Sequence, residues 1–165
     1  MRRPPDEELR ALGLVVFDFD GVFTCNRVWV DEHGTESVAC WRGDGIGLRR
    51  LDAVGIPYLI LSTEPNPVVS RRAAKLRIRS RQGLDDKAAA LAEEAARAGV
   101  PLGGVAYMEN DVNDVPCLER VGLPVVPADA WPEVVPLARW VLDRPGGHGC
   151  VRELCDAVWR AAGSP

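Results

Sequence analysis

The feature that most constrains the fold of this chain is a series of short apolar runs that alternate with segments of helical pattern. The first run, residues 11–19, is almost continuously apolar, which is typical of a strand covered on both faces. Three further runs follow at residues 58–61, 104–108 and 124–126. Because strands and helices in alternation form right-handed crossovers, the pattern predicts a Rossmann-like α/β fold with a mostly parallel sheet and helices on both faces.

Helices are expected at about residues 45–53, 67–76, 86–98, 113–121, 132–138 and 150–162. The third is the best delimited, since Asp86 precedes an alanine-rich run, Gly99 closes it and Pro101 prevents its continuation. Residues 27–41 depart from the alternation, because two strand-like runs there flank a glycine-containing turn. This segment predicts a β-hairpin inserted after the first strand. No linker divides the chain, so a single domain over residues 1–165 is expected.

The composition excludes several classes of protein. A chain of 165 residues that is 47% hydrophobic can bury a core without disulfides or a structural metal. No apolar run approaches the roughly 18 residues of a membrane span, and a net charge of −4 argues against a general nucleic-acid binder. The five cysteines form no CxxC pair and the N-terminus lacks the apolar segment of a signal peptide, so a cytoplasmic location is expected.

Two carboxylates, Asp18 and Asp20, come directly after the first strand, and Gly21 allows a sharp turn behind them. Open α/β sheets bind their ligands at this carboxyl edge. Two nearby carboxylates can act differently, one as nucleophile or metal ligand and the other as proton donor, because their environments set their protonation separately. Taken alone, such a pair is more typical of solvated turn residues.

Polar residues follow the other predicted strands too. Ser62 and Thr63 come after the second strand, where a hydroxyl could bind a phosphoryl oxygen or simply cap the next helix. Lys87 lies in the first turn of a helix, where the helix dipole disfavours a cation. The third run leads into an oxygen-rich cluster suited to a hard cation such as Mg²⁺, or to a capped turn: Glu109, Asn110, Asp111, Asn113 and Asp114.

In this order the four features resemble the motifs of the haloacid dehalogenase superfamily of phosphotransferases: residues 18–24, Ser62, Lys87 and residues 110–114. Within it, the segments Arg-Gly-Asp-Gly-Ile-Gly at 42–47 and Gly-Gly-His-Gly-Cys-Val-Arg-Glu at 146–153, with the hairpin, are similar to the capless sugar-acid phosphatases. That group comprises the 3-deoxy-octulosonate 8-phosphate and 2-keto-3-deoxynononate 9-phosphate phosphatases and a similar domain of some acylneuraminate cytidylyltransferases.

The resemblance implies a Mg²⁺-dependent phosphomonoesterase that works through a covalent intermediate. Asp18 would be the nucleophile that becomes an aspartyl phosphate. Asp20 would protonate the leaving alkoxide and then deprotonate the attacking water. Ser62 and Lys87 would neutralise charge on the phosphoryl oxygens, which is what phosphoryl transfer chiefly needs.

The resemblance also implies the metal site: the Asp18 carboxylate, the Asp20 carbonyl, and Asn110 and Asp111 of the fourth motif, with Asp114 behind them. The chain departs from the family pattern at two of its positions. Glu109 stands where the family usually has glycine, and Asn110 where it most often has an aspartate ligand. A neutral ligand at 110 would weaken Mg²⁺ binding unless Asp111 or Glu109 contributes.

The expected substrate is a small sugar phosphate. Thr63 and Glu64 with Lys75 downstream are similar to the nine-carbon group, so a nonulosonate 9-phosphate is expected and the octulosonate 8-phosphate is the alternative. Glu64 would accept hydrogen bonds from sugar hydroxyls and Lys75 would bind the carboxylate, unless both are surface residues of a helix. The full substrate-binding set expected is Thr24, Arg42, Thr63, Glu64, Lys75 and His148.

A homotetramer is expected, because a capless phosphatase has no cover of its own and the hairpin or the glycine-rich segment around His148 could serve a neighbour. Trp29 and Trp41 would then lie in or near the interface. The competing interpretation is a non-catalytic oligomerisation or regulatory domain. The joint presence of both motif aspartates with Ser62 and Lys87 argues against that interpretation, since a domain used only for assembly has no physical need for them.

Overall fold

The computed structural model describes residues 3–163. Its centre is a sheet of six parallel strands in the order β5–β4–β1–β6–β7–β8. The strands span Leu14–Phe17 (β1), Tyr58–Leu61 (β4), Arg79–Arg81 (β5), Val105–Met108 (β6), Leu123–Val126 (β7) and Trp140–Val141 (β8). The expected α/β fold with a mostly parallel sheet is confirmed.

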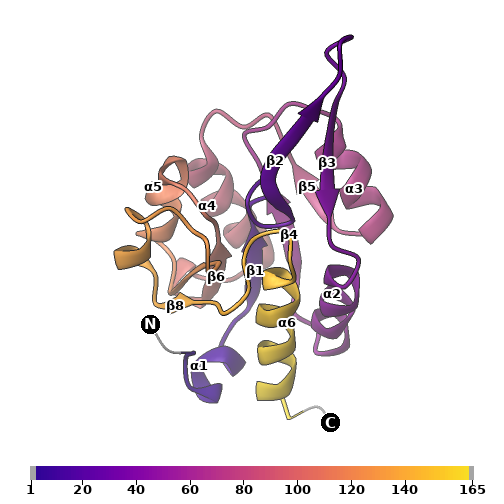
Figure 1. The fold of residues 1–165 in the computed structure, drawn as a ribbon. Helices are drawn as coiled ribbons and strands as arrows, with labels where there is room; N and C mark the ends of the chain where they lie inside the picture. Colours follow the sequence, from indigo (N-terminus) through magenta and orange to yellow (C-terminus); the bar gives the residue numbers. More distant parts are fainter. Residues whose placement is uncertain (1–2, 164–165) are drawn as a thin grey trace.

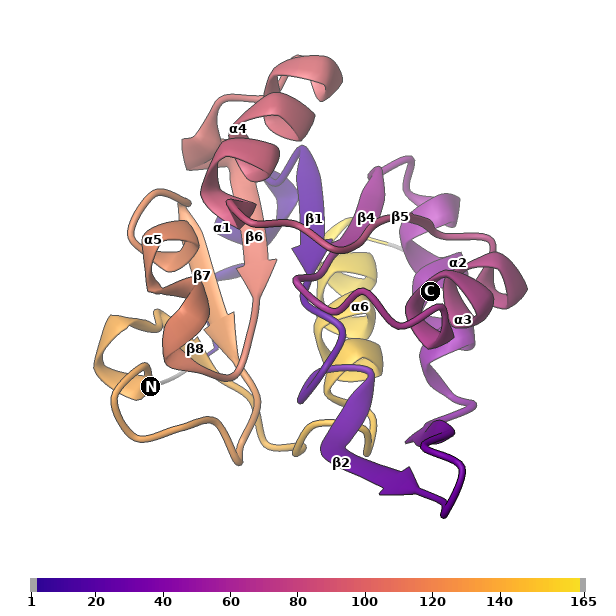
Figure 2. The same cartoon turned by 90° about the horizontal axis from the view of Figure 1, so that it is seen from above.

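Helices cover both faces of this sheet (Figures 1 and 2). They are Asp6–Arg10 (α1), Asp44–Ala53 (α2), Val68–Leu76 (α3), Lys87–Ala98 (α4), Val115–Leu118 (α5) and Cys150–Ala161 (α6), with 3₁₀ turns at Leu102–Gly104 (η1), Val112–Asp114 (η2) and Val135–Leu137 (η3). In Figure 2, α4 and α5 lie on one side and α2, α3 and α6 on the other. Within residues 3–163, no helix is long and apolar enough to cross a membrane.

Two apolar cores lie on the two faces of the sheet, and the strands supply both. In β1, Val15 and Phe17 pack into the core beneath α2 and α6, whereas Leu14 and Val16 pack into the core beneath α4 and α5. This is the alternation of period two that a strand imposes on its side chains. All four β1 residues are buried, which explains why the run reads as continuously apolar.

Two expected helices are wrong in extent. Residues 113–121 form only η2 and the four-residue α5, because Pro116 near the start of α5 cannot donate a backbone hydrogen bond to the turn before it. Residues 132–138 form only η3, with Pro136 inside it and Ala138 already extended. The strands β5 and β8 and the helix α1 were not expected, since all three are short and β5 consists of polar residues.

The hairpin is confirmed as Thr24–Val30 (β2) paired antiparallel with Glu36–Cys40 (β3). It projects beyond the rest of the molecule from the edge of the sheet where β1 ends (Figure 1). Its side chains Val28, Trp29 and Val30 are more than half exposed. The hairpin therefore extends outward beside the loops that follow β1, β4 and β6.

Candidate active site

The loops after β1, β4 and β6 converge on a pocket of about 100 Å³ at the carboxyl edge of the sheet. Because the central strands are parallel and adjacent, the residues that follow each of them meet at this edge. The pocket is lined by Asp18, Asp20, Asn26, Ser62, Thr63, Asn110, Asp111 and Asn113. Residues from three of the four predicted motifs thus share one small polar pocket.

Asp18 and Lys87 form a buried ion pair at the base of this pocket. Nζ of Lys87 lies 2.8 Å from Oδ1 of Asp18, and the backbone N–H of Phe19 donates to the same oxygen at 2.6 Å. Burial raises the pKa of Asp18 to about 7, although Lys87 opposes this shift. Both of these contacts are made by Oδ1 of Asp18, and no other described residue makes a hydrogen bond or ion pair with Oδ2. Oδ2 is therefore the oxygen available for attack on a substrate.

Lys87 is held between two carboxylates, which explains its place at the first residue of α4. Its Nζ lies 2.6 Å from Oδ2 of Asp114 as well as close to Asp18. Burial alone would lower the pKa of Lys87, but the two carboxylates raise it overall. Asp86 caps the helix by accepting from the backbone N–H of Ala89 at 2.9 Å. The ion pairs therefore offset the unfavourable interaction with the helix dipole.

Asp20 is positioned by the turn that follows β1. The Thr24 hydroxyl donates to Oδ1 of Asp20 at 3.2 Å and accepts from the backbone N–H groups of Gly21 and Asn26. Burial raises the pKa of Asp20, against the effect of the Thr24 hydrogen bond. Thr24 is fully buried and does not line the pocket, so its hydroxyl acts on Asp20 rather than on open space.

Gly21 allows the first and fourth motifs to approach each other. Its φ is +71°, and a Cβ at this position would lie 2.1 Å from Cγ of Asn110. The Asn110 side chain, 8% exposed, therefore lies directly against the backbone of the first loop. No other residue type could keep both the turn and this contact.

The turn after β6 places Asn110 and Asp111 in the pocket with Glu109 buried behind them. Oδ1 of Asp111 accepts from the backbone N–H of Val112 at 2.7 Å, and the Asn110 carbonyl accepts from the backbone N–H of Trp131 at 2.8 Å. Burial raises the pKa of Glu109 to about 8, although the backbone N–H of Asp111 opposes this shift.

Tyr107 and Asn26 were not identified as functional residues from the sequence, and Asn113 was named only as a member of the oxygen-rich cluster after β6. The Tyr107 hydroxyl donates to Oδ2 of Asp114 at 2.7 Å. Because Tyr107 lies in the apolar strand β6, the sequence indicates only a core residue there. Asn26 and Asn113 line the pocket. Asn26 has a φ of +59°, and an asparagine two residues after the first motif is the signal that could have found it.

The residues after β4 divide between the pocket and its rim. Ser62 is buried and lines the pocket, and its Oγ accepts from the backbone N–H of Glu64 at 3.1 Å. Thr63 is exposed and lines the pocket too. Glu64 is half-buried outside it, with Oε1 accepting from the backbone N–H of Asn66 at 2.7 Å.

Arg42 and Lys75 are brought together, but in a second hollow, of about 560 Å³, between the hairpin, α2 and α3. Its charged lining residues are all basic: Arg42, Arg49, Arg71, Arg72 and Lys75. We call this hollow the basic pocket. Neither residue lines the catalytic pocket, and neither does His148, whose side chain is exposed. Their predicted contacts with substrate stay predictions.

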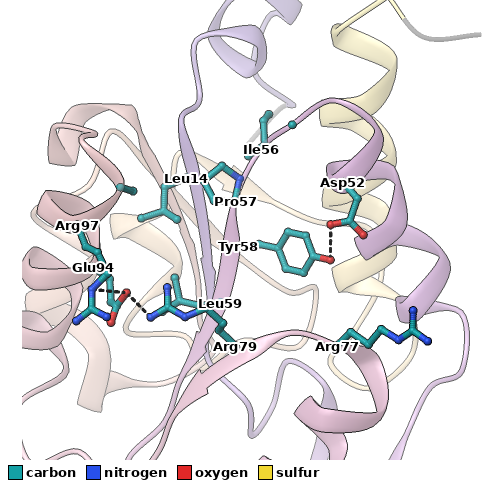
Figure 3. Close-up of a pocket in the computed structure, with 12 residues that line it drawn as sticks. Leu14, Asp52, Ile56, Pro57, Tyr58, Leu59, Arg77, Arg79, Glu94 and Arg97 are labelled. Carbon is teal, nitrogen blue, oxygen red and sulfur yellow. Dashed lines mark hydrogen bonds and ion pairs between the residues drawn. The ribbon is translucent and has the colours of Figure 1, made fainter.

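A hollow of about 490 Å³ lies at the opposite edge of the sheet, where β1, β4 and β5 begin (Figure 3). Its polar groups are largely paired with one another. The Tyr58 hydroxyl donates to Asp52 at 2.8 Å, and the buried Glu94 accepts from Arg79 at 3.0 Å (Figure 3). This hollow therefore lacks the convergent unpaired groups of an active site.

The donor set of the catalytic pocket fits magnesium. The side chains available are carboxylates and amides, which are the hard oxygen ligands Mg²⁺ prefers. No three histidine, cysteine, aspartate or glutamate side chains between residues 3 and 163 gather as a ready-made metal cluster.

Comparison with known proteins supports the same conclusion. No family model matches the chain. The chain is 34% identical over 151 residues to the 3-deoxy-D-manno-octulosonate 8-phosphate phosphatase KdsC of Salmonella typhi, covering 91% of this chain and 80% of that protein. A structure from Streptomyces avermitilis, described as a HAD family hydrolase, is 44% identical with a TM-score of 0.88, covering 94% of this chain and 88% of the other.

The fold, the convergent motifs and these relatives place the chain in the haloacid dehalogenase superfamily of hydrolases, and it belongs to that family as a phosphatase. More particularly, it is a homologue of the 3-deoxy-D-manno-octulosonate 8-phosphate phosphatases. The Moraxella catarrhalis member, in complex with a magnesium ion, a phosphate ion and KDO, is 28% identical with a TM-score of 0.89, covering 94% of this chain and 90% of the other.

Proposed function

We propose that this protein is a Mg²⁺-dependent phosphatase of a 2-keto-3-deoxy sugar acid phosphate, with a nonulosonate 9-phosphate as the substrate. The observation that carries the proposal is the pocket in which Asp18, Asp20, Ser62 and the fourth motif meet, with Lys87 bound to Asp18 at 2.8 Å. Phosphoryl transfer depends on such positioning and on charge stabilisation more than on covalent chemistry of the protein.

In the first step Oδ2 of Asp18 attacks phosphorus. A bond forms between this oxygen and phosphorus, the bond from phosphorus to the sugar oxygen breaks, and an aspartyl phosphate results. The contact with Lys87 favours the ionised carboxylate that this attack requires. We propose that the same ammonium group and the Ser62 hydroxyl stabilise charge on the phosphoryl oxygens; Ser62 lines the pocket, and Lys87 lies behind Asp18.

Asp20 moves the proton in both steps. Its protonated carboxyl group donates to the leaving sugar oxygen, and the carboxylate then accepts a proton from the water that hydrolyses the aspartyl phosphate. A pKa raised by burial suits a group that must be protonated in the first step. The Thr24 hydroxyl donates to Oδ1 of Asp20, and we propose that Oδ2 carries the transferred proton.

Asp18, the Asp20 carbonyl, and Asn110 or Asp111 would hold magnesium, which would supply positive charge against the phosphoryl oxygens when bound. Asp114 does not line the pocket, and it acts by orienting Lys87. Tyr107 donates to the same Asp114 oxygen and so holds that carboxylate in place against Lys87.

The choice of a nine-carbon substrate rests on Thr63, Glu64 and Lys75. The relatives are named as octulosonate 8-phosphate phosphatases, and that alternative substrate fits the proposal equally well. The basic pocket supports an anionic substrate in either case, because five cations there have no acidic neighbour in its lining. We propose that the positive charge of the basic pocket recognises the substrate carboxylate. Arg42 and Lys75 of this pocket, and His148 outside it, are the proposed contacts.

A release assay for inorganic phosphate tests the proposal. Both sugar acid phosphates, with glucose 6-phosphate as the neutral-sugar control, are supplied with Mg²⁺ and with excess chelator. We expect Mg²⁺-dependent release from both sugar acids, a higher kcat/KM for the nonulosonate, and little release from the control. A higher kcat/KM for the octulosonate would favour the alternative substrate. No Mg²⁺-dependent release from either sugar acid would contradict the proposal and favour a non-catalytic domain.

We further propose that the chain works as a homotetramer. The exposed Val28, Trp29 and Val30 give strand β2 an apolar segment next to the polar turn of the projecting hairpin (Figure 1). Between residues 3 and 163 the element order contains no cap domain besides the hairpin, and we propose that a neighbouring copy covers the catalytic pocket.

A further inference from the structure

Glu109 is a buried carboxylate that the reaction steps above do not use. It follows β6 directly, is fully buried, and its Oε1 has no hydrogen-bond partner among the described residues. Its Oε2 accepts from the backbone N–H of Asp111 at 2.5 Å. Glu109 does not line the catalytic pocket, so its effect on the pocket passes through the backbone of Asp111.

The backbone after β6 adopts a turn that two neighbouring residues of the site require. Consecutive side chains of an extended strand point to opposite sides, yet Asn110 and Asp111 both line the pocket. The backbone of Trp131 fixes the Asn110 carbonyl at 2.8 Å, and Oε2 of Glu109 fixes the Asp111 N–H. A glycine at position 109 could not make the second of these contacts, since it has no side-chain acceptor.

We propose that Glu109 is a positioning residue that holds this turn, so that Asn110 and Asp111 both reach the pocket that would hold magnesium. The proposal rests on the metal site of the proposed function. The Asp111 N–H needs an acceptor oxygen at this place, and a side-chain oxygen can supply it whether the side chain is charged or neutral. Asn110 contributes no charge to the site. The affinity for Mg²⁺ therefore depends more on the geometry of the Asn110 and Asp111 oxygens than it would with an aspartate at position 110.

The turn itself is tested by amide hydrogen exchange of Asp111, followed by NMR in the metal-free protein. The variants are Glu109→Gln, which keeps an acceptor oxygen without the charge, and Glu109→Ala, which keeps neither. Leu91→Ala, in the buried part of α4, controls for general destabilisation. We expect protection to stay within about threefold of wild type in Glu109→Gln and in Leu91→Ala, and to fall about tenfold or more in Glu109→Ala. Unchanged protection in Glu109→Ala would overturn the proposal.

The link to the metal is tested by Mn²⁺ binding, measured by electron paramagnetic resonance without substrate. We expect the Kd of Glu109→Gln within about threefold of wild type and that of Glu109→Ala raised about tenfold. Equal weakening in both variants would overturn the proposal, because the charge and not the acceptor would then matter. A wild-type protein that bound no Mn²⁺ would instead overturn the metal site of the proposed function, while the exchange experiment would still decide whether Glu109 holds the turn.

Discussion

At the scale of single residues, the site depends on charges that are buried and paired. Lys87 is 5% exposed and lies between Asp18 and Asp114. The sequence shows that Lys87 is unusual for the first turn of a helix, and the resemblance assigns it to the phosphate. Its two carboxylate partners, and the Tyr107 hydroxyl behind one of them, could not be predicted, because they depend on how strands distant in sequence are placed side by side.

Replacing Lys87 with methionine removes this charge while keeping much of the side-chain volume. We expect kcat to fall roughly 100-fold, by analogy with the loss of one preorganised charge-stabilising group. We also expect a lower Tm, since Asp18 and Asp114 would stay buried without their cation. Phosphate release by the folded variant checks this, with Arg97→Met, an exposed position on α4, as control. A rate equal to wild type would place Lys87 outside the chemistry.

Asp44 is a second buried carboxylate, and it predicts a pH dependence of stability. Within residues 3–163, neither of its oxygens has a partner of good hydrogen-bond geometry. Burial raises its pKa from 3.8 to about 7, and the facing Arg152 backbone and Arg72 lower it only in part. Between these two pH values the folded chain binds more protons than the unfolded chain, so this group's contribution to stability is lost as pH rises through 7.

Asp44→Asn removes the titration. We expect the variant to gain stability over wild type as pH rises from 5 to 8, by on the order of 1–4 kcal/mol, because only the wild-type chain has to bury a charge at the higher pH. Thermal unfolding of both proteins at each pH measures this. A difference in Tm that is the same at pH 5 and pH 8 would show that Asp44 does not titrate in this range.

At the scale of elements, the buried strands were predictable and the short edge elements were not. β1, β4, β6 and β7 are each apolar and covered on both faces, so composition alone marks them. β5, with the sequence Arg-Ser-Arg, is stabilised by its pairing with β4 and has no apolar signal. The catalytic motifs could be predicted because they follow the apolar strands. The basic pocket could not be predicted, because it depends on how α2, α3 and the hairpin pack together.

Substrate recognition is predicted to depend on α3. If Lys75 binds the substrate carboxylate, Lys75→Ala should lower kcat/KM for the sugar acid phosphate by roughly 5- to 150-fold. Hydrolysis of p-nitrophenyl phosphate, which has no carboxylate, should change little. Arg97→Ala, at the far hollow of Figure 3, is the control for loss of one exposed cation. Equal losses on both substrates would mean that Lys75 supports the fold or the chemistry instead.

At the scale of the whole molecule, the sheet explains why motifs far apart in sequence form one site. Asp18 and Asn110 are 92 residues apart, yet β1 and β6 pair directly and Gly21 lets the two loops touch. The right-handed crossover rule predicts parallel neighbouring strands but does not by itself specify the order β5–β4–β1–β6–β7–β8. The exposed Trp29 and Trp41 of the hairpin region can be recognised in the sequence as candidate interface residues, whereas the surface of a partner cannot.

The homotetramer predicts a mass of about 72 kDa by light scattering, four times the chain mass of 17.9 kDa. Trp29→Asp should dissociate the assembly, because it places a charge in apolar surface that would be buried between copies. Glu32→Gln, at the exposed turn of the hairpin, is the control. A wild-type mass near 18 kDa at micromolar concentration would contradict the prediction.

The covalent role of Asp18 is the central claim, and the rate of Asp18→Asn tests it most directly. The substitution keeps the shape of the side chain but removes the nucleophilic charge. Phosphate release is compared at saturating Mg²⁺ and substrate, with circular dichroism to confirm the fold. We predict a kcat below about one-thousandth of wild type in a folded variant. A folded variant that kept more than about a tenth of the wild-type rate would contradict an aspartyl phosphate at Asp18.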